Sequence, residues 1–234
     1  MTAERRRAKQ SGQEIVEFGL MAVFYVPLLL GAFVTGMNLI RSIQINQACR
    51  DLDDMYIHGA YFSTYPMQQL AQRLAQGLNL QIGSSFSGND NSNTDNGGDA
   101  LVTITQIMWI GSVTSQSCAA YGAGNCTNHD SFVYTQQIQF GNGTLADSST
   151  VTIGSPTGVS MTDAGNIEDY VIDSHAKLAS APQAAMQSLW QINTNGQSPL
   201  RDGQVVYIAE FYARSPGLSI GNLLGNGVYA RYFF

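Results

Sequence analysis

The sequence predicts an α+β protein, in which a long N-terminal transmembrane and stalk helix packs on a small, mostly antiparallel β-sheet domain. Three observations predict this fold. Residues 18–40 contain no charged side chain over 23 positions. Helical spacing of apolar residues continues beyond that stretch, and three runs rich in β-branched and aromatic residues follow further along the chain.

The uncharged stretch is long enough to cross a membrane. At about 1.5 Å per helical residue it covers the roughly 30 Å hydrocarbon core. It is longer than the apolar part of a secretory signal, and no small-x-small cleavage site follows it. Pro27 lies in mid-span, where we expect a harmless kink.

Charge indicates the orientation of the span. The basic residues Arg5, Arg6, Arg7 and Lys9 precede it, whereas only Arg41 and Arg50 follow it closely. Because positive residues stay on the cytoplasmic side, the N-terminus is expected in the cytoplasm. The sequence thus predicts a basic segment at 1–12, a transmembrane helix at 13–41 and an extracytoplasmic stalk and α+β domain at 42–234.

Beyond the membrane, two helical patterns are expected. Ala48, Leu52, Met55, Tyr56 and Gly59 follow one another at steps of three and four, which predicts an amphipathic stalk. A second helix is expected from Pro66 to Gly77, with proline at its start and glycine at its end. Three acidic residues of the stalk are interpreted as a solvated helix face in preference to a metal site: Asp51, Asp53 and Asp54.

The remainder predicts one sheet with a single covered face, and the stalk helix as its cover. Strands are expected at 100–110, 131–140 and 204–213, and a helix at about 166–191. Residues 83–99 are almost all turn-formers, so they are interpreted as a solvated connector. A calcium loop is the alternative there, but the glycine and terminal glutamate of an EF-hand are missing from the matching positions.

Charge and cysteine content narrow the functional classes. Beyond the first twelve residues the chain has no cluster of basic side chains, which argues against a nucleic-acid partner. Cys118 and Cys126 flank a short, turn-rich stretch, and in an oxidising compartment a disulfide between them is expected; two free buried thiols are the alternative. Cys49 is then left over, packed on a helix.

No constellation indicates catalysis, a metal or a cofactor. Residues 217–221 match Gly-x-Ser-x-Gly, but the thirteen residues after them contain no Asp, Glu or His to complete a hydrolase triad around Ser219. His58, His129 and His175 are scattered, without metal-ligand spacing. We therefore expect a protein that is not an enzyme. A membrane-tethered hydrolase that uses Ser219 is the alternative hypothesis.

Glu17 is the informative anomaly, because a carboxylate at the edge of an apolar span is costly unless it is paired. It belongs to the sequence Ser-Gly-Gln-Glu-Ile-Val-Glu-Phe at residues 11–18. This stretch resembles the processing site of type IV prepilins and pseudopilins, where a peptidase cuts after glycine and the mature chain has glutamate fifth. The resemblance implies cleavage between Gly12 and Gln13, and a role in subunit assembly for Glu17 and Phe18.

Within that superfamily the chain is most similar to the TadE-like minor pilins or pseudopilins of tight-adherence (type IVc) pili. The similarity lies in residues 12–20, 27–31 and 36–41, in a late strand at 205–216 and in the closing segment 229–234. Pro27 stands further from the Glu-Phe pair than is usual in the family, and about residues 80–200 match nothing.

The resemblance implies a pilus or secretion-filament subunit in the bacterial inner membrane, with its C-terminal domain in the periplasm and a role in cell adhesion or secretion. Its expected partners are a prepilin peptidase, other pilin and pseudopilin subunits, the inner-membrane pilus assembly platform and the lipid bilayer. The alternative is an uncleaved single-pass anchor that displays an adhesive or ligand-binding periplasmic domain. In that case Gly12 and Glu17 have no role.

Overall fold

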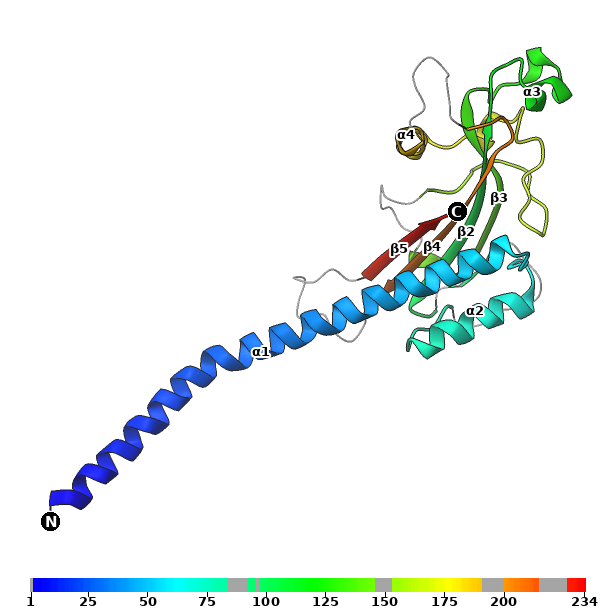
Figure 1. Ribbon diagram of the computed structural model, residues 1–234. Coiled ribbons are helices and arrows are strands. Elements are labelled where there is room, and N and C mark those ends of the chain that lie inside the picture. The colour runs from blue at the N-terminus through cyan, green and yellow to red at the C-terminus, as the bar shows by residue number, and fades with distance from the viewer. Residues whose placement is uncertain (1, 84–91, 96, 146–152, 191–199, 215–226) are drawn as a thin grey trace. The chain divides into compact units, whose positions relative to one another are not determined.

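The computed structural model describes residues 2–83, 92–95, 97–145, 153–190, 200–214 and 227–234. The chain divides into two compact units, Met1–Arg41 and Ser42–Phe234. The first unit consists of the N-terminal part of helix α1 (Thr2–Ile57), and Pro27 lies inside this helix without ending it. Figure 1 shows α1 together with the sheet elements of the second unit.

Within the described residues, one helical segment, Glu14–Ile57, is long and apolar enough to cross a membrane. Between Ile15 and Ile40 most of its large apolar side chains are more than half exposed, whereas Val34 is buried. Such exposure is unfavourable in water and is what a lipid-facing helix requires. The long apolar N-terminal helix predicted from the sequence is confirmed on these grounds of length and composition.

The second unit is built on a five-stranded mixed sheet with the order β1-β3-β2-β4-β5. Its strands are β1 (Ser92–Asp95), β2 (Ala100–Ile110), β3 (Ser131–Asn142), β4 (Val205–Arg214) and β5 (Gly227–Phe233). The β3–β2, β2–β4 and β4–β5 pairs are antiparallel, whereas β1 pairs with β3 in parallel. The sheet is therefore mostly, but not fully, antiparallel.

One face of the sheet packs against the C-terminal part of α1 and against helix α2 (Tyr65–Gly77). The α1 side chains in this core are Ile45, Ala48, Cys49, Leu52 and Tyr56, which recur at steps of three and four. The Phe62 ring stacks on that of Phe140 of β3, with centroids 6.0 Å apart. The expected stalk helix thus covers this face.

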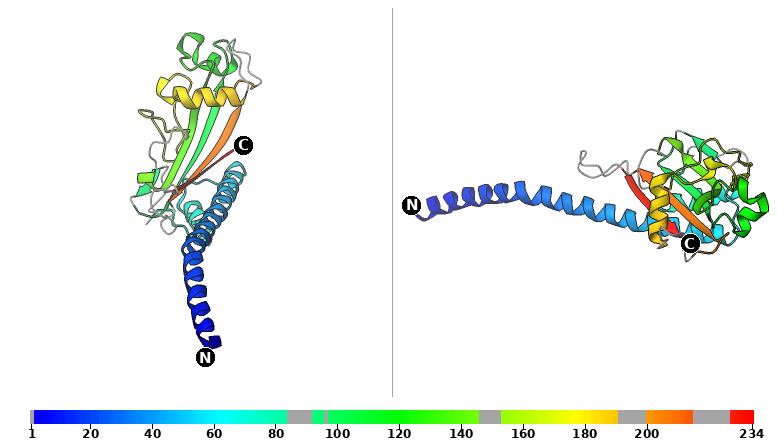
Figure 2. Two further views of the ribbon diagram at one scale, coloured as in Figure 1. Left: turned by 90° about the vertical axis from the view of Figure 1, so that its left-hand side faces the viewer. Right: turned by 90° about the horizontal axis from the view of Figure 1, so that it is seen from above.

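The opposite face is covered as well, so the prediction of a single covered face is wrong. Residues 153–178 and helix α4 (Ser180–Leu189) lie on this side, and α4 is seen across the strands from α1 in Figures 1 and 2. The core here contains Trp109, Phe132 and Tyr134. Because both faces are covered, β2 is buried along nearly its whole length instead of alternating.

The expected helix at about 166–191 is shorter than predicted. Only α4 and the single turn η3 (Ser174–Ala176) are helical, and residues 166–173 form turns and bridges. Asp173 explains part of the difference, since its carboxylate accepts the backbone N–H of His175 and so caps a new turn locally.

The connector expected at 83–99 also differs, because it contains β1. Residues 84–91 and 96 of this segment lie outside the described part of the chain. The remaining short elements are α3 (Gln116–Tyr121), η1 (Ala123–Asn125) and η2 (Gly143–Leu145).

Candidate functional site

The residues expected at the processing site all lie on α1. Gly12 and Gln13 belong to the helical backbone, and Glu17 and Phe18 follow one turn later. Residues 13 and 17 are four apart, so they share one face of the helix. Phe18 is 77% exposed, as a side chain that meets lipid or a neighbouring helix would be.

A second group of polar residues is buried where α1 meets the sheet. The Cys49 thiol donates a 3.1 Å hydrogen bond to the carbonyl oxygen of Ala209 on β4. Burial raises its pKa to about 12, and the nearby acids Asp53 and Glu210 act in the same direction. A neutral buried thiol is a poor nucleophile, so Cys49 acts as a packing residue that ties α1 to the strand.

Glu210 of β4 lies in the same region and is almost fully buried. Its Oε1 accepts a 2.8 Å hydrogen bond from the amide of Ile153 and another from the hydroxyl of Tyr229. Burial raises the pKa of Glu210 and outweighs these hydrogen bonds and the charge of Arg231, which lower it. Sequence reasoning missed this residue, because a glutamate inside a strand gives no sign of its burial.

Asp53 overturns the interpretation of the stalk acids as one solvated face. Asp51 and Asp54 are exposed, whereas Asp53 is completely buried. Among the described residues, neither of its carboxylate oxygens has a hydrogen-bond partner. Burial, followed by the charge of Asp54, raises the pKa of Asp53 to about 7. On the helix, position 53 continues the buried face of Cys49 and Tyr56, while 51 and 54 point away from it.

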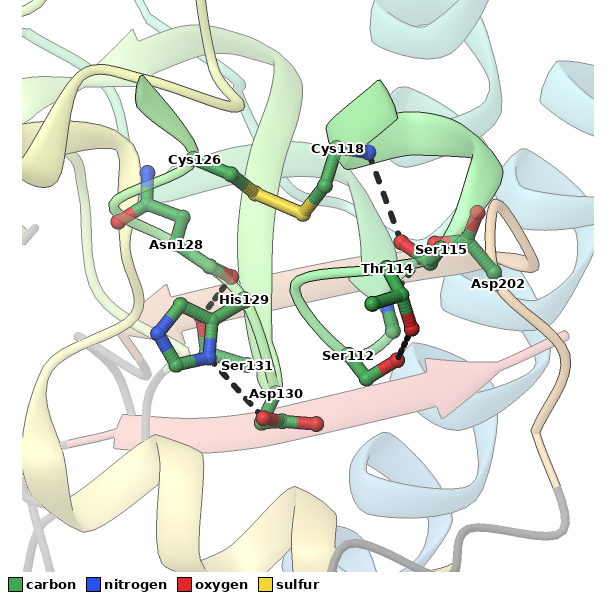
Figure 3. Close-up of polar contacts among 11 residues, drawn as sticks. Ser112, Thr114, Ser115, Cys118, Cys126, Asn128, His129, Asp130, Ser131 and Asp202 are labelled. Atoms are coloured by element: carbon green, nitrogen blue, oxygen red, sulfur yellow. Dashed lines mark hydrogen bonds and ion pairs between the residues drawn. A yellow bond between two sulfur atoms is a disulfide. The ribbon is translucent and has the colours of Figure 1, made fainter. Parts of the chain in front are cut away.

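The cysteine pair expected from the sequence is joined in the structure by a disulfide, Cys118–Cys126, at one end of the sheet (Figure 3). It closes a short loop that contains the C-terminal part of α3 (Gln116–Tyr121) and all of η1 (Ala123–Asn125). Ser115 caps α3 by accepting the amide N–H of Cys118. The carboxylate of Asp202, which comes from the β4 side, accepts 2.8 Å hydrogen bonds from the amides of Gly111 and Ser117. The loop is therefore held at two points.

An open groove of about 510 Å³ lies beside this loop. Asn125 and Thr127 line it on the loop side, and Glu168, Asp169 and Asp173 line it on the other. The groove is open and its lining is acidic, whereas most small molecules bind in enclosed, mostly apolar pockets. No cluster of three metal-ligating side chains occurs among the described residues.

The candidate catalytic residues are not brought together in the described part of the chain. His58, His129 and His175 are exposed, and each lies beside its own aspartate: Asp54, Asp130 and Asp173. Ser219 and the Gly-x-Ser-x-Gly stretch lie outside the described residues. Trp109 of β2, by contrast, is a core residue.

Comparisons with protein-family models, with curated proteins and with solved structures returned no match to this chain. The class that the structure defines is an α+β protein in which one helix of the described residues is able to span a membrane.

Proposed function

We propose that this chain is a minor pilin or pseudopilin, which works by assembly into, or initiation of, a tight-adherence pilus or related secretion filament. A prepilin peptidase cuts it after Gly12, and Gln13 becomes the new N-terminus. The protein is anchored in the bacterial inner membrane with residues 1–12 in the cytoplasm and residues 42–234 in the periplasm. It performs no catalytic step of its own.

The observation that supports this proposal best is that α1 has two structural roles. The same helix supplies the apolar segment that can span a bilayer and, at its C-terminal end, the core residues that pack on the sheet. A helix built in this way can present its apolar part to lipid or to neighbouring subunits while remaining part of the domain. The sequence Gly12 to Phe18 stands directly ahead of the apolar segment.

The charge of Glu17 fits the same role. Cleavage after Gly12 creates an α-amino group with a pKa near 8, which is largely cationic at neutral pH. In the membrane a carboxylate and an amine from neighbouring subunits attract each other strongly, and their pairing fixes the register of helix on helix. The Cys118–Cys126 disulfide supports an oxidising compartment for the domain.

The deciding experiment is to determine the N-terminus of the membrane-purified full chain by mass spectrometry, in cells that contain an active prepilin peptidase. Wild type is expected to begin at Gln13 and Gly12→Val at the original N-terminus. Gly31→Val is the matched control, because this helical glycine has no atom within 4 Å of an added Cβ. It should be cut like the wild type.

The proposal would be overturned if the wild type kept residues 1–12 in cells that do cleave a known prepilin. The chain would then be an uncleaved anchor, and its function would have to be sought on the outer surface of residues 42–234.

A further inference from the structure

Asp53 is a buried acid that the proposed function does not use. It lies on α1 among the residues that pack on the sheet, and its exposed fraction is 0%. Neither carboxylate oxygen has a hydrogen-bond partner in the part of the chain that the structure describes. A buried ionised carboxylate without partners is strongly unfavourable, whereas the neutral acid is tolerated far better.

Within the described residues, the charged and titratable groups that act on Asp53 include no cation to balance it. On α1 it interacts with Cys49, Asp54 and Tyr56. From the sheet, Tyr207 of β4 adjoins Tyr56, and Glu210 of β4 adjoins Cys49. All of these groups are neutral or acidic.

The basic side chains in the neighbourhood are engaged elsewhere. Arg50 lies 3.5 Å from the carboxylate of Asp51, and the imidazole of His58 lies 3.5 Å from that of Asp54. Both pairs are exposed. Arg231 of β5 acts on Glu210.

Asp53 also stands between two hydrogen bonds that hold α1 on the sheet. One turn before it, the Cys49 thiol donates to the Ala209 carbonyl. One turn after it, the Tyr56 hydroxyl donates to Oε1 of Gln136 on β3. Ionisation of Asp53 therefore places a charge in the middle of this helix–sheet contact.

We propose that Asp53 is a proton-controlled latch: its neutral carboxyl keeps residues 45–57 of α1 seated on the sheet, and its ionisation loosens them. The latch concerns the contact within residues 42–234 and does not depend on cleavage or on filament assembly.

The direction of the pH effect follows from the pKa values in the two states. In the open state the carboxyl meets water and has its ordinary pKa near 4, while burial raises the pKa to about 7 in the closed state. The closed state binds the proton more tightly, so it is most stable below about pH 4 and weakens as the pH rises through 7. Well above about pH 7 the stability of the closed state no longer changes with the ionisation of Asp53.

The test is hydrogen exchange of the full chain in detergent micelles, followed by mass spectrometry on peptides that cover residues 45–57. After correction for intrinsic exchange rates, opening of this segment should increase at least about ten-fold between about pH 5 and pH 8. Peptides from β2 serve as the internal reference and should not change by this factor.

Three variants assign the effect to Asp53. Asp53→Asn keeps the shape of the side chain and cannot ionise, so residues 45–57 should stay protected at both pH values. Asp51→Asn removes an exposed acid from the same helix and should behave like the wild type. His58→Gln removes the exposed imidazole beside Asp54 on the same helix and should also leave the pH effect in place.

Protection in the wild type that does not change with pH would overturn the latch. So would a pH effect that survives in Asp53→Asn or disappears in His58→Gln.

Discussion

The carboxylate of Asp202 accepts a 2.8 Å hydrogen bond from the backbone amide of Ser117, which lies 85 residues earlier in the chain. Its other oxygen accepts the amide of Gly111 at the same distance. One side chain on the approach to β4 therefore holds the disulfide loop against the end of the sheet. Burial raises the pKa of Asp202, but the hydrogen bonds to it outweigh burial, and the pKa is lowered overall.

Replacing Asp202 with alanine should destabilise the domain by about 1–3 kcal/mol, because two amides lose a charged acceptor. Denaturant unfolding of the full chain in micelles measures this. Since the folded-state pKa is lowered, the stabilisation is present above about pH 4 and is lost as the pH falls through the lower folded-state value. Asp51→Ala is the control, because this helical residue has an exposed carboxylate that pairs with the exposed Arg50. Equal losses in the two variants would contradict this role.

The three cysteines should differ sharply in reactivity. Cys118 and Cys126 are bonded to each other, and Cys49 is the one free thiol and is buried. A thiol reagent at about pH 8 should therefore label none in the native protein, one after denaturation and three after denaturation with reductant. Two additional thiols in the denatured protein without reductant would show that the disulfide does not form.

Loss of the disulfide should lower the free energy of unfolding by about 2–3 kcal/mol, the value expected for closing a loop of this length. The paired substitution of both cysteines by serine, measured beside reduced wild type, checks this. The two samples should agree, because each removes the same cross-link.

The regular elements of the fold were predictable where local chemistry dominates. The strand expected at 100–110 has the observed bounds, and those expected at 131–140 and 204–213 differ by at most two residues. Their β-branched and aromatic side chains fit a pleated, buried surface. β1 has little of this character: its residues are Ser, Asn, Thr and Asp, of which only Thr94 is β-branched and none is aromatic, and it is a strand because it pairs with β3. Local composition does not indicate which distant segments pair as strands.

The second covered face escaped prediction for a related reason. Residues 153–178 have little regular structure, and they are held by individual contacts. The Tyr134 hydroxyl donates to the Ile153 carbonyl at 2.6 Å, and the Gln137 side chain donates to the Gly154 carbonyl at 2.8 Å. No periodicity marks such contacts in the sequence. The burial of Asp53 escaped prediction for the same reason, because only the position of the sheet distinguishes Asp53 from Asp51 and Asp54.

Gly141 of β3 should tolerate no side chain. Its φ is +117°, and an added Cβ would lie 2.5 Å from the Ala100 carbonyl oxygen and 2.8 Å from Cγ2 of Ile82. We expect Gly141→Ala to cost several kcal/mol, since both the backbone conformation and the packing of β2 on β3 must change. Gly77→Ala is the matched control, because its Cβ would meet nothing within 4 Å. A Gly141→Ala protein that unfolds at the wild-type denaturant concentration would contradict this close approach.

A substitution at Glu17 distinguishes subunit assembly from cleavage after Gly12. If its carboxylate pairs with the new amine of a neighbouring subunit, Glu17→Gln should leave cleavage after Gly12 unchanged and reduce incorporation into filaments at least about ten-fold, since one pKa unit of lost charge interaction already corresponds to that factor. Sheared filaments and the membrane fraction, compared by quantitative mass spectrometry of residues 42–234, give the incorporated share. Glu14→Gln is the control, because it removes a carboxylate three residues away that lies outside the proposed pair. Equal incorporation of Glu17→Gln and wild type would remove Glu17 from assembly, and a loss shared by Glu14→Gln would assign the effect to total charge at the membrane edge.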